Sequence, residues 1–293
     1  MNVRICLFAA VAFISCATAL SAQTGPLPDR IRRTMTFQDT EREYFVWQPP
    51  RFDRNKEYWL LVAIYSNPML NDLQRAIAAS GFEAIMISPT FRDDNINLTR
   101  FPVSTESDFF AEVLKAVRAE YSIRPRILLT GYSRGAQFAH RYAFAHPGEI
   151  EALAPLASGT WTTPDGRLLV EEIGEVRDAR TFLSNPQNAK RVPDRLADLF
   201  APEIAAVAEI KAVKGSERIP VLVMCGTLDP RLPIAKEFAR SLEASGYRVS
   251  TEWPRTPHVC GPGNPKCAAE FGSEFAKYST TTVGFFQQVT RSK

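Results

Sequence analysis

The sequence is poor in the features that mark several classes of protein. It carries a net charge of only +3 over 293 residues and has no run of five basic residues, so we expect no nucleic-acid partner. Three histidines and five cysteines are too few for a cluster of metal ligands, and we expect neither a metal nor a cofactor. Beyond the N-terminal segment no apolar stretch is long enough to cross a bilayer. What remains is a globular protein, for which 45% hydrophobic and 23% charged residues are ordinary.

Residues 1–22 differ in kind from the rest of the chain. A positively charged start, an apolar run and a small, polar end follow one another, which is the plan of a secretory signal peptide. We expect cleavage after Ala19 or Ala22 and a secreted or periplasmic protein of residues 23–293. The minority alternative is a lipid anchor at Cys16, since the residues before it loosely resemble a lipoprotein box.

Export changes how the remaining cysteines are interpreted. Cys225 lies in an apolar segment and is expected to be a small buried hydrophobic residue. Cys260 and Cys267 flank the turn-rich sequence Gly-Pro-Gly-Asn-Pro-Lys, which can bring their α-carbons together. In an oxidising compartment a disulfide between them is favoured over two free thiols.

Apolar segments of strand length alternate with amphipathic segments of helical length. The expected strands are residues 34–38, 42–48, 58–65, 82–88, 127–130, 150–157, 220–225 and 247–253, after an irregular leader over 23–33. The expected helices are residues 72–80, 106–121, 136–145, 234–245 and a closing helix within 270–289. This alternation predicts an α/β fold with a mostly parallel central sheet between helices.

Residues 160–215 interrupt the alternation with a charged stretch that has moderate helical character over 168–182 and 195–214. The stretch follows one expected strand and precedes the next, which places it at the carboxyl edge of the sheet, where ligands bind in open α/β sheets. We expect a small helical cap, with an elaborated surface connection as the alternative.

The pentapeptide Gly131-Tyr132-Ser133-Arg134-Gly135 joins an expected strand to an expected helix. The pattern G-x-S-x-G in this context is typical of a sharp turn that presents a nucleophilic serine above the end of a sheet. The glycines suit it because they tolerate close backbone contact and unusual backbone angles. We therefore take Ser133 as the candidate nucleophile; the alternative is a glycine-rich turn with a bystander serine.

A serine needs an adjacent base, normally a histidine oriented by a carboxylate. His140 follows Ser133 by seven residues on one helix, roughly 10 Å along its axis and too far to bond back. His146 lies farther along and suits the helix C-terminus. His258 follows a strand in a proline- and glycine-rich loop, and elimination makes it the expected base. A histidine in an ordinary surface loop is the alternative.

Asp229 is the expected acid because it comes just after an apolar strand, on the sheet edge that carries Ser133. Asp165 and Asp178 are alternatives within the expected cap, and Asp229 could instead be a turn or capping residue. Stabilisation of an oxyanion needs backbone N–H donors.

One donor should be the backbone N–H of Arg134. The other should come from the loop after the strand over 58–65, from Ser66 or, preferably, Asn67, because Pro68 has no N–H.

With these residues in place, the sequence resembles the α/β-hydrolase superfamily, and more narrowly secreted esterases of the polyhydroxybutyrate-depolymerase and feruloyl-esterase types. The resemblance is carried by residues 41–49, 60–64, 126–137, 146–147, 226–229 and His258. It implies the α/β-hydrolase fold and a triad of Ser133, Asp229 and His258. The sequence departs from those families at Tyr65-Ser66, where they usually have His-Gly, and at Arg134, where a small residue or methionine is common.

The sequence therefore predicts an exported serine hydrolase that cleaves small-molecule or polymeric carboxylic esters through an acyl-enzyme. A peptidase, amidase or acyltransferase on the same fold is the alternative, and a non-catalytic binding module is the alternative of another class. Trp161 and Tyr65 are candidates for the wall of the substrate pocket, although either could pack in the core.

Overall fold

The computed structural model describes residues 29–65, 67–91, 105–172, 175–178, 218–258, 260 and 265–291. The expected signal peptide, the lipid-anchor alternative at Cys16 and Ser66 lie outside these residues. So do residues 173–174 and 179–217, which make up most of the expected cap.

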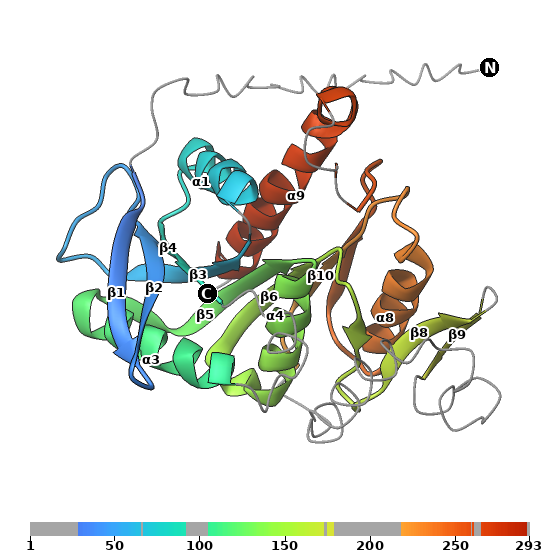
Figure 1. Ribbon diagram of the computed structural model, residues 1–293, viewed down its shortest axis with the longest axis horizontal. Helices are drawn as coiled ribbons and strands as arrows, with labels where there is room; N and C mark the ends of the chain where they lie inside the picture. Colours follow the sequence, from blue (N-terminus) through green and yellow to red (C-terminus); the bar gives the residue numbers. More distant parts are fainter. Residues whose placement is uncertain are drawn as a thin grey trace, which may run out of the picture.

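An eight-stranded sheet in the order β1-β2-β4-β3-β5-β6-β10-β11 forms the centre of the protein (Figure 1). Its strands are β1 (Ile31–Phe37), β2 (Thr40–Trp47), β3 (Tyr58–Ile64), β4 (Ala84–Pro89), β5 (Ile123–Tyr132), β6 (Ile150–Leu156), β10 (Val221–Met224) and β11 (Val249–Glu252). Only the β1–β2 and β2–β4 pairs are antiparallel. The predicted mostly parallel sheet is therefore confirmed.

Helices cover both faces of this sheet, as Figure 1 shows. Helices α1 (Asn67–Ser80) and α9 (Pro265–Arg291) lie on one face, and α3 (Thr105–Glu120), α4 (Arg134–Ala145) and α8 (Leu232–Ala244) lie on the other. The inner strands are apolar throughout because both of their faces are covered; every residue of β6 is buried. Two hydrophobic cores result, one on each side of the sheet.

Strand β1 begins earlier than the sequence predicted. The irregular leader was expected to reach residue 33, but Ile31–Phe37 is a strand whose residues alternate between half-buried and exposed. Two of its arginines pair with acids of other elements: Arg32 lies 2.5 Å from Glu43 of β2, and Arg33 lies 2.5 Å from Glu120 of α3. Arg32 is exposed and Arg33 is half-buried, so the two arginines lie on opposite faces of this edge strand, each beside an acidic partner.

The helical prediction for residues 168–182 is wrong where the structure describes them. A second, three-stranded antiparallel sheet is built from β7 (Trp161–Thr162), β8 (Leu168–Glu172) and β9 (Glu175–Asp178). The turn between β7 and β8 contains Gly166 at a φ of 79°, a left-handed conformation that suits glycine. The glutamates of β8 and β9 give these segments a helical preference, but intrinsic helix propensity is a weak signal. Pairing between the strands overrides it, and local composition does not reveal that pairing.

Strands β3, β5, β10 and β11 are parallel, so the loops that follow them meet at one edge of the sheet. Tyr65, Ser133, Asp229 and His258 all lie in or next to these loops. No helix in the described part of the chain is long and apolar enough to cross a bilayer.

Candidate active site

Ser133 sits at a strained turn between β5 and α4. Its backbone has a φ of 54° and a ψ of −115°, which is rare for a residue with a side chain. The turn is tied to the sheet because the N–H of Ser133 donates to the carbonyl of Leu156 at 3.0 Å. Strain of this kind is typical of functional positions that the surrounding fold holds in place.

The two glycines of the turn are required by close backbone contact. A Cβ at Gly131 would lie 2.2 Å from the carbonyl oxygen of Gly135, and a Cβ at Gly135 would lie 2.0 Å from that of Ile64. Both distances are far below any real carbon contact. Gly135 therefore lets the start of α4 approach the end of β3, which brings the loop after β3 next to Ser133.

Ser133, His258 and Asp229 form a continuous chain of hydrogen bonds. Ser133 Oγ lies 2.9 Å from His258 Nε2, and His258 Nδ1 lies 2.7 Å from Asp229 Oδ2. Because an ionised carboxylate only accepts, Nδ1 carries the proton and Nε2 is free to accept from the serine. The imidazole is thereby held in the tautomer that a general base for Ser133 requires.

Asp229 is buried at the end of β10. Burial alone would raise the pKa of its carboxyl group, but the hydrogen bonds from His258 and from the N–H of Arg231 outweigh that effect and hold the pKa below its usual value. The Arg231 N–H donates to Oδ1 at 2.9 Å. The carboxylate therefore remains ionised beside the imidazole at neutral pH.

The other two histidines lie elsewhere. His140 is fully buried in α4, where Nδ1–H donates to the carbonyl of Ala136 at 2.6 Å and Nε2 accepts from the N–H of Thr162 at 3.0 Å. Burial, followed by the nearby charge of Arg141, holds the pKa of His140 far below its usual value. His146 stacks on the ring of Tyr142 with centroids 4.5 Å apart. Among the described residues, no hydrogen bond joins either histidine to Ser133.

Two of the expected oxyanion donors are the first residues of helices. Arg134 is the first residue of α4 and Asn67 the first of α1. The first N–H groups of a helix have no partner within the helix and point outward from its end. Ser66 lies outside the described residues. The side chain of Arg134 is exposed to solvent.

The two candidates for the pocket wall both make contacts within the fold. The Tyr65 hydroxyl bonds Thr130 Oγ1 at 2.7 Å, and that hydroxyl in turn donates to the carbonyl of Ala154 at 2.7 Å. Trp161 is fully buried, with its ring 4.6 Å from that of Phe238. Trp161 packs in the core, whereas Tyr65 is half-buried and packs against the core on the α1 and α9 side of the sheet; a pocket-wall role for either residue stays a prediction.

The loop that carries His258 is fixed at its far end by a disulfide between Cys260 and Cys267, whose α-carbons lie 5.6 Å apart. Cys267 belongs to the first turns of α9, so the bond ties the loop to that helix. Cys225 is free and buried, as expected.

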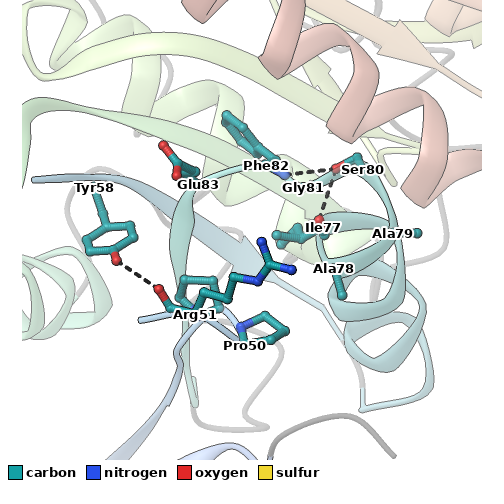
Figure 2. A pocket seen from close by; sticks show the side chains of 11 residues that line it. Pro50, Arg51, Tyr58, Ile77, Ala78, Ala79, Ser80, Gly81, Phe82 and Glu83 are labelled. Atoms are coloured by element: carbon teal, nitrogen blue, oxygen red, sulfur yellow. Dashed lines mark hydrogen bonds between the residues drawn. The ribbon is translucent and has the colours of Figure 1, made fainter. Parts of the chain in front are cut away.

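A separate pocket of about 530 Å³ opens at the opposite, amino edge of the sheet (Figure 2). It is lined in part by Arg51, Tyr58, Ser80 and Phe82, and it contains none of the residues in the hydrogen-bonded chain. The Tyr58 hydroxyl points toward the carbonyl of Arg51 there. Among the described residues, no three His, Cys, Asp or Glu side chains gather as a metal site would require.

Comparison with solved structures identifies the fold. The structure is similar to that of a ferulic acid esterase, with a TM-score of 0.61 and 15% sequence identity over 89% of this chain and 98% of that one. The fluorophosphonate-binding serine hydrolase FphF of Staphylococcus aureus gives 0.54 and 14% over 85% of this chain and 99% of its own. An arylesterase gives 0.56 and 17% over 91% and 89%. The chain has the α/β-hydrolase fold.

No protein-family model matches the sequence, and no curated protein matches it. The α/β-hydrolase fold of this protein is therefore visible through its structure and through a few short motifs. At 12 to 17% identity, the solved relatives establish the architecture and leave the chemistry to be argued from the site.

Sequence reasoning missed the role of one residue at this site. Tyr132, directly before Ser133, donates its hydroxyl to the backbone carbonyl of His258. Its ring is also stacked on the imidazole, with centroids 5.7 Å apart. The contact joins residues 126 positions apart, and no local pattern could have revealed it.

Proposed function

We propose that this protein is an exported serine hydrolase that cleaves carboxylic esters through an acyl-enzyme on Ser133. The observation that carries the proposal is the hydrogen-bonded chain from Ser133 Oγ to His258 Nε2, at 2.9 Å, and from His258 Nδ1 to Asp229 Oδ2, at 2.7 Å. The names of its structural neighbours, a ferulic acid esterase and an arylesterase among them, favour an ester as the substrate.

In this mechanism Ser133 Oγ attacks the ester carbonyl while His258 Nε2 takes its proton. Asp229 keeps the proton on Nδ1 and stabilises the imidazolium that forms. His258 then returns the proton to the departing alkoxide, and water, activated by the same nitrogen, attacks the acyl-enzyme and releases the acid.

The negative charge that develops on the carbonyl oxygen is met by backbone donors. The N–H of Arg134 at the start of α4 is one, and the N–H of Asn67 at the start of α1 is the other. A donor of this kind typically lowers the barrier by about 3 kcal/mol. The close approach of Gly135 to Ile64 supports this pairing, because Ile64 ends the strand that leads to α1 and Gly135 lies in the first turn of α4.

Two features support action outside the cytoplasm: the expected signal peptide over residues 1–22 and the disulfide Cys260–Cys267, a bond that persists in oxidising compartments. Removal of the signal would leave residues 23–293 as the mature enzyme.

A fluorophosphonate probe tests the nucleophile, because it phosphonylates an activated serine. Wild-type protein should be labelled at Ser133, and Ser133→Ala and His258→Ala should each lose labelling and ester turnover while the melting temperature changes little. His146→Ala is the matched control and should keep full activity. Unlabelled, folded wild-type protein would support a non-catalytic binding module instead.

A series of p-nitrophenyl esters from acetate to decanoate, run beside matching anilides and short peptides, tests the substrate class. Turnover of esters well above that of anilides is expected. Peptide turnover without ester turnover would overturn the esterase proposal.

A further inference from the structure

Two consecutive residues contact the same histidine at its two ends. Ser133 meets the imidazole at Nε2, and the hydroxyl of Tyr132 meets the backbone carbonyl of His258. Because Tyr132 and Ser133 are neighbours in the chain, these two hydrogen bonds join the nucleophile turn to both the side chain and the backbone of His258, in the loop after β11. The position of the imidazole relative to Ser133 is therefore defined from both sides by one turn.

The loop around His258 has firm anchors before that residue. The N–H of Leu228 donates to the carbonyl of Thr256 at 3.0 Å, and the Thr256 hydroxyl lies 3.1 Å from that of Tyr278 in α9. A Cβ at Gly226 would lie 2.0 Å from the same carbonyl, so the loop presses directly on the chain that leads to Asp229. These contacts end at Thr256.

The backbone of His258 itself is held by a single hydrogen bond among the described residues. Within the described part of the chain, the hydrogen bond from Tyr132 is the one that reaches the main chain of this residue. The ring of Tyr132 adds a stacked contact with the imidazole and an edge-on contact with Tyr278, each with centroids 5.7 Å apart. Tyr132 thus fills the space between the nucleophile turn, the His258 loop and α9.

The hydroxyl of Tyr132 is suited to a permanent role as donor. Burial, followed by the nearby groups of Tyr278 and Asp229, raises the pKa of this phenol far above its usual value. It therefore stays protonated and able to donate at any pH at which a serine hydrolase works.

We propose that Tyr132 is a positioning residue, whose hydroxyl holds the backbone of His258 so that Nε2 stays within hydrogen-bonding distance of Ser133 Oγ. The inference rests on the proposed function, since it assigns to Tyr132 the alignment of the base with the nucleophile. Without the hydroxyl, the carbonyl of His258 loses this hydrogen bond, and we expect the imidazole to shift relative to Ser133 Oγ. A misplacement of about 1 Å at a reacting group costs up to about 100-fold in rate.

The test is the Tyr132→Phe variant, which removes one oxygen and keeps the stacked ring. Tyr58→Phe is the matched control. Tyr58 is the first residue of the neighbouring strand β3, so it lies at the amino ends of the strands, away from Ser133. Its hydroxyl accepts from the N–H of Asp53 at 2.7 Å (Figure 2 shows its surroundings). Both variants lose a phenol oxygen that bonds to the backbone, but only one of them borders His258.

Two rates are measured: phosphonylation of Ser133 by a fluorophosphonate, and steady-state hydrolysis of p-nitrophenyl butyrate. For Tyr132→Phe we expect both phosphonylation and kcat to fall by about 10- to 100-fold, with KM within twofold of wild type. Tyr58→Phe should keep the wild-type rates, while both variants lower the melting temperature by similar amounts. A purely structural role for Tyr132 would give no such split between rate and stability.

Each outcome decides. The positioning role is overturned if wild type and Tyr132→Phe are labelled at the same rate. It is also overturned if Tyr132→Phe and Tyr58→Phe are slowed equally. Either result leaves the proposed function intact. Wild-type protein that is not labelled at Ser133 overturns the proposed function and the inference together. If Tyr132→Phe does not fold, Tyr132→His replaces it, because an imidazole keeps a ring beside His258 but is too short to reach the carbonyl; unchanged labelling of that variant refutes the proposal.

Discussion

The substitution Asp229→Asn tests the proposed chemistry at the point where the structure is most specific. An asparagine has the same shape as an aspartate but replaces one acceptor oxygen by an NH₂ donor. Two groups compete for the oxygen that remains: the backbone N–H of Arg231, 2.9 Å from Oδ1, and His258 Nδ1, 2.7 Å from Oδ2. The N–H of Arg231 is fixed in the backbone and can only donate, so it retains the oxygen.

The NH₂ group must then face His258. Nδ1 can accept from it only as the unprotonated nitrogen, which moves the ring proton to Nε2 and points it at Ser133 Oγ. In this tautomer the histidine cannot take the serine proton. The loss expected from a wrong tautomer is about 10⁴-fold in kcat, or about 5 kcal/mol of transition-state stabilisation.

The assay is hydrolysis of p-nitrophenyl butyrate, with thermal unfolding as a check that the fold survives. Asp165→Asn is the matched control. Asp165 also sits in a turn, where it pairs with Arg167 at 3.0 Å, and its replacement should leave kcat unchanged. An Asp229→Asn variant that keeps more than a tenth of the wild-type kcat would refute the tautomer argument, and loss of activity in Asp165→Asn would favour that residue as the acid.

Three further predictions concern stability. Gly135→Ala should lower the free energy of unfolding, measured in urea, by about 3 kcal/mol or more, because the new Cβ collides with the carbonyl of Ile64. Gly284→Ala, which adds a Cβ in open space within α9, should raise it by about 0.5–1 kcal/mol. Equal effects of the two substitutions would contradict the collision. Because burial keeps the pKa of His140 low, the unfolded chain alone binds its proton below pH 6.5; stability should therefore fall by about 1 kcal/mol per pH unit below 6.5 and less steeply in His140→Gln. Loss of the Cys260–Cys267 disulfide in Cys267→Ser should cost about 2–3 kcal/mol, given a separation of seven residues, and no change in melting temperature would exclude a stabilising role.

Sequence reasoning worked best where the signal was local. The strand–helix alternation predicted the parallel sheet, because strands covered on both faces must be apolar throughout, as β6 is. The two glycines around Ser133 predicted the sharp turn, which the backbone angles of Ser133 now describe. His140 was set aside from its distance along one helix, and the structure places it in the core.

What could not be predicted depends on partners far away in the chain. The first residues of strand β1, Ile31–Arg33, were assigned to the irregular leader, because nothing local reveals that Glu43 and Glu120 lie beside the two arginines. Strands β8 and β9 were expected to be helical because nothing within their own residues reveals that they pair. The contact of Tyr132 with His258 is of the same kind. Hydrophobic periodicity reports which residues are buried, but it does not report what they are buried against.

The order of the strands has a consequence for the time at which activity can arise. Ser133 follows β5 in the middle of the sheet, but Asp229 and His258 follow β10 and β11, which occupy one edge and come late in the chain. A nascent chain folded only as far as β6 would carry the serine turn without its acid or its base. Helix α9, which completes the core beside α1 and anchors the loop of His258, comes later still. Under the proposed function, a chain that still lacks β10, β11 and α9 therefore has no complete triad, and hydrolysis requires the C-terminal part of the chain.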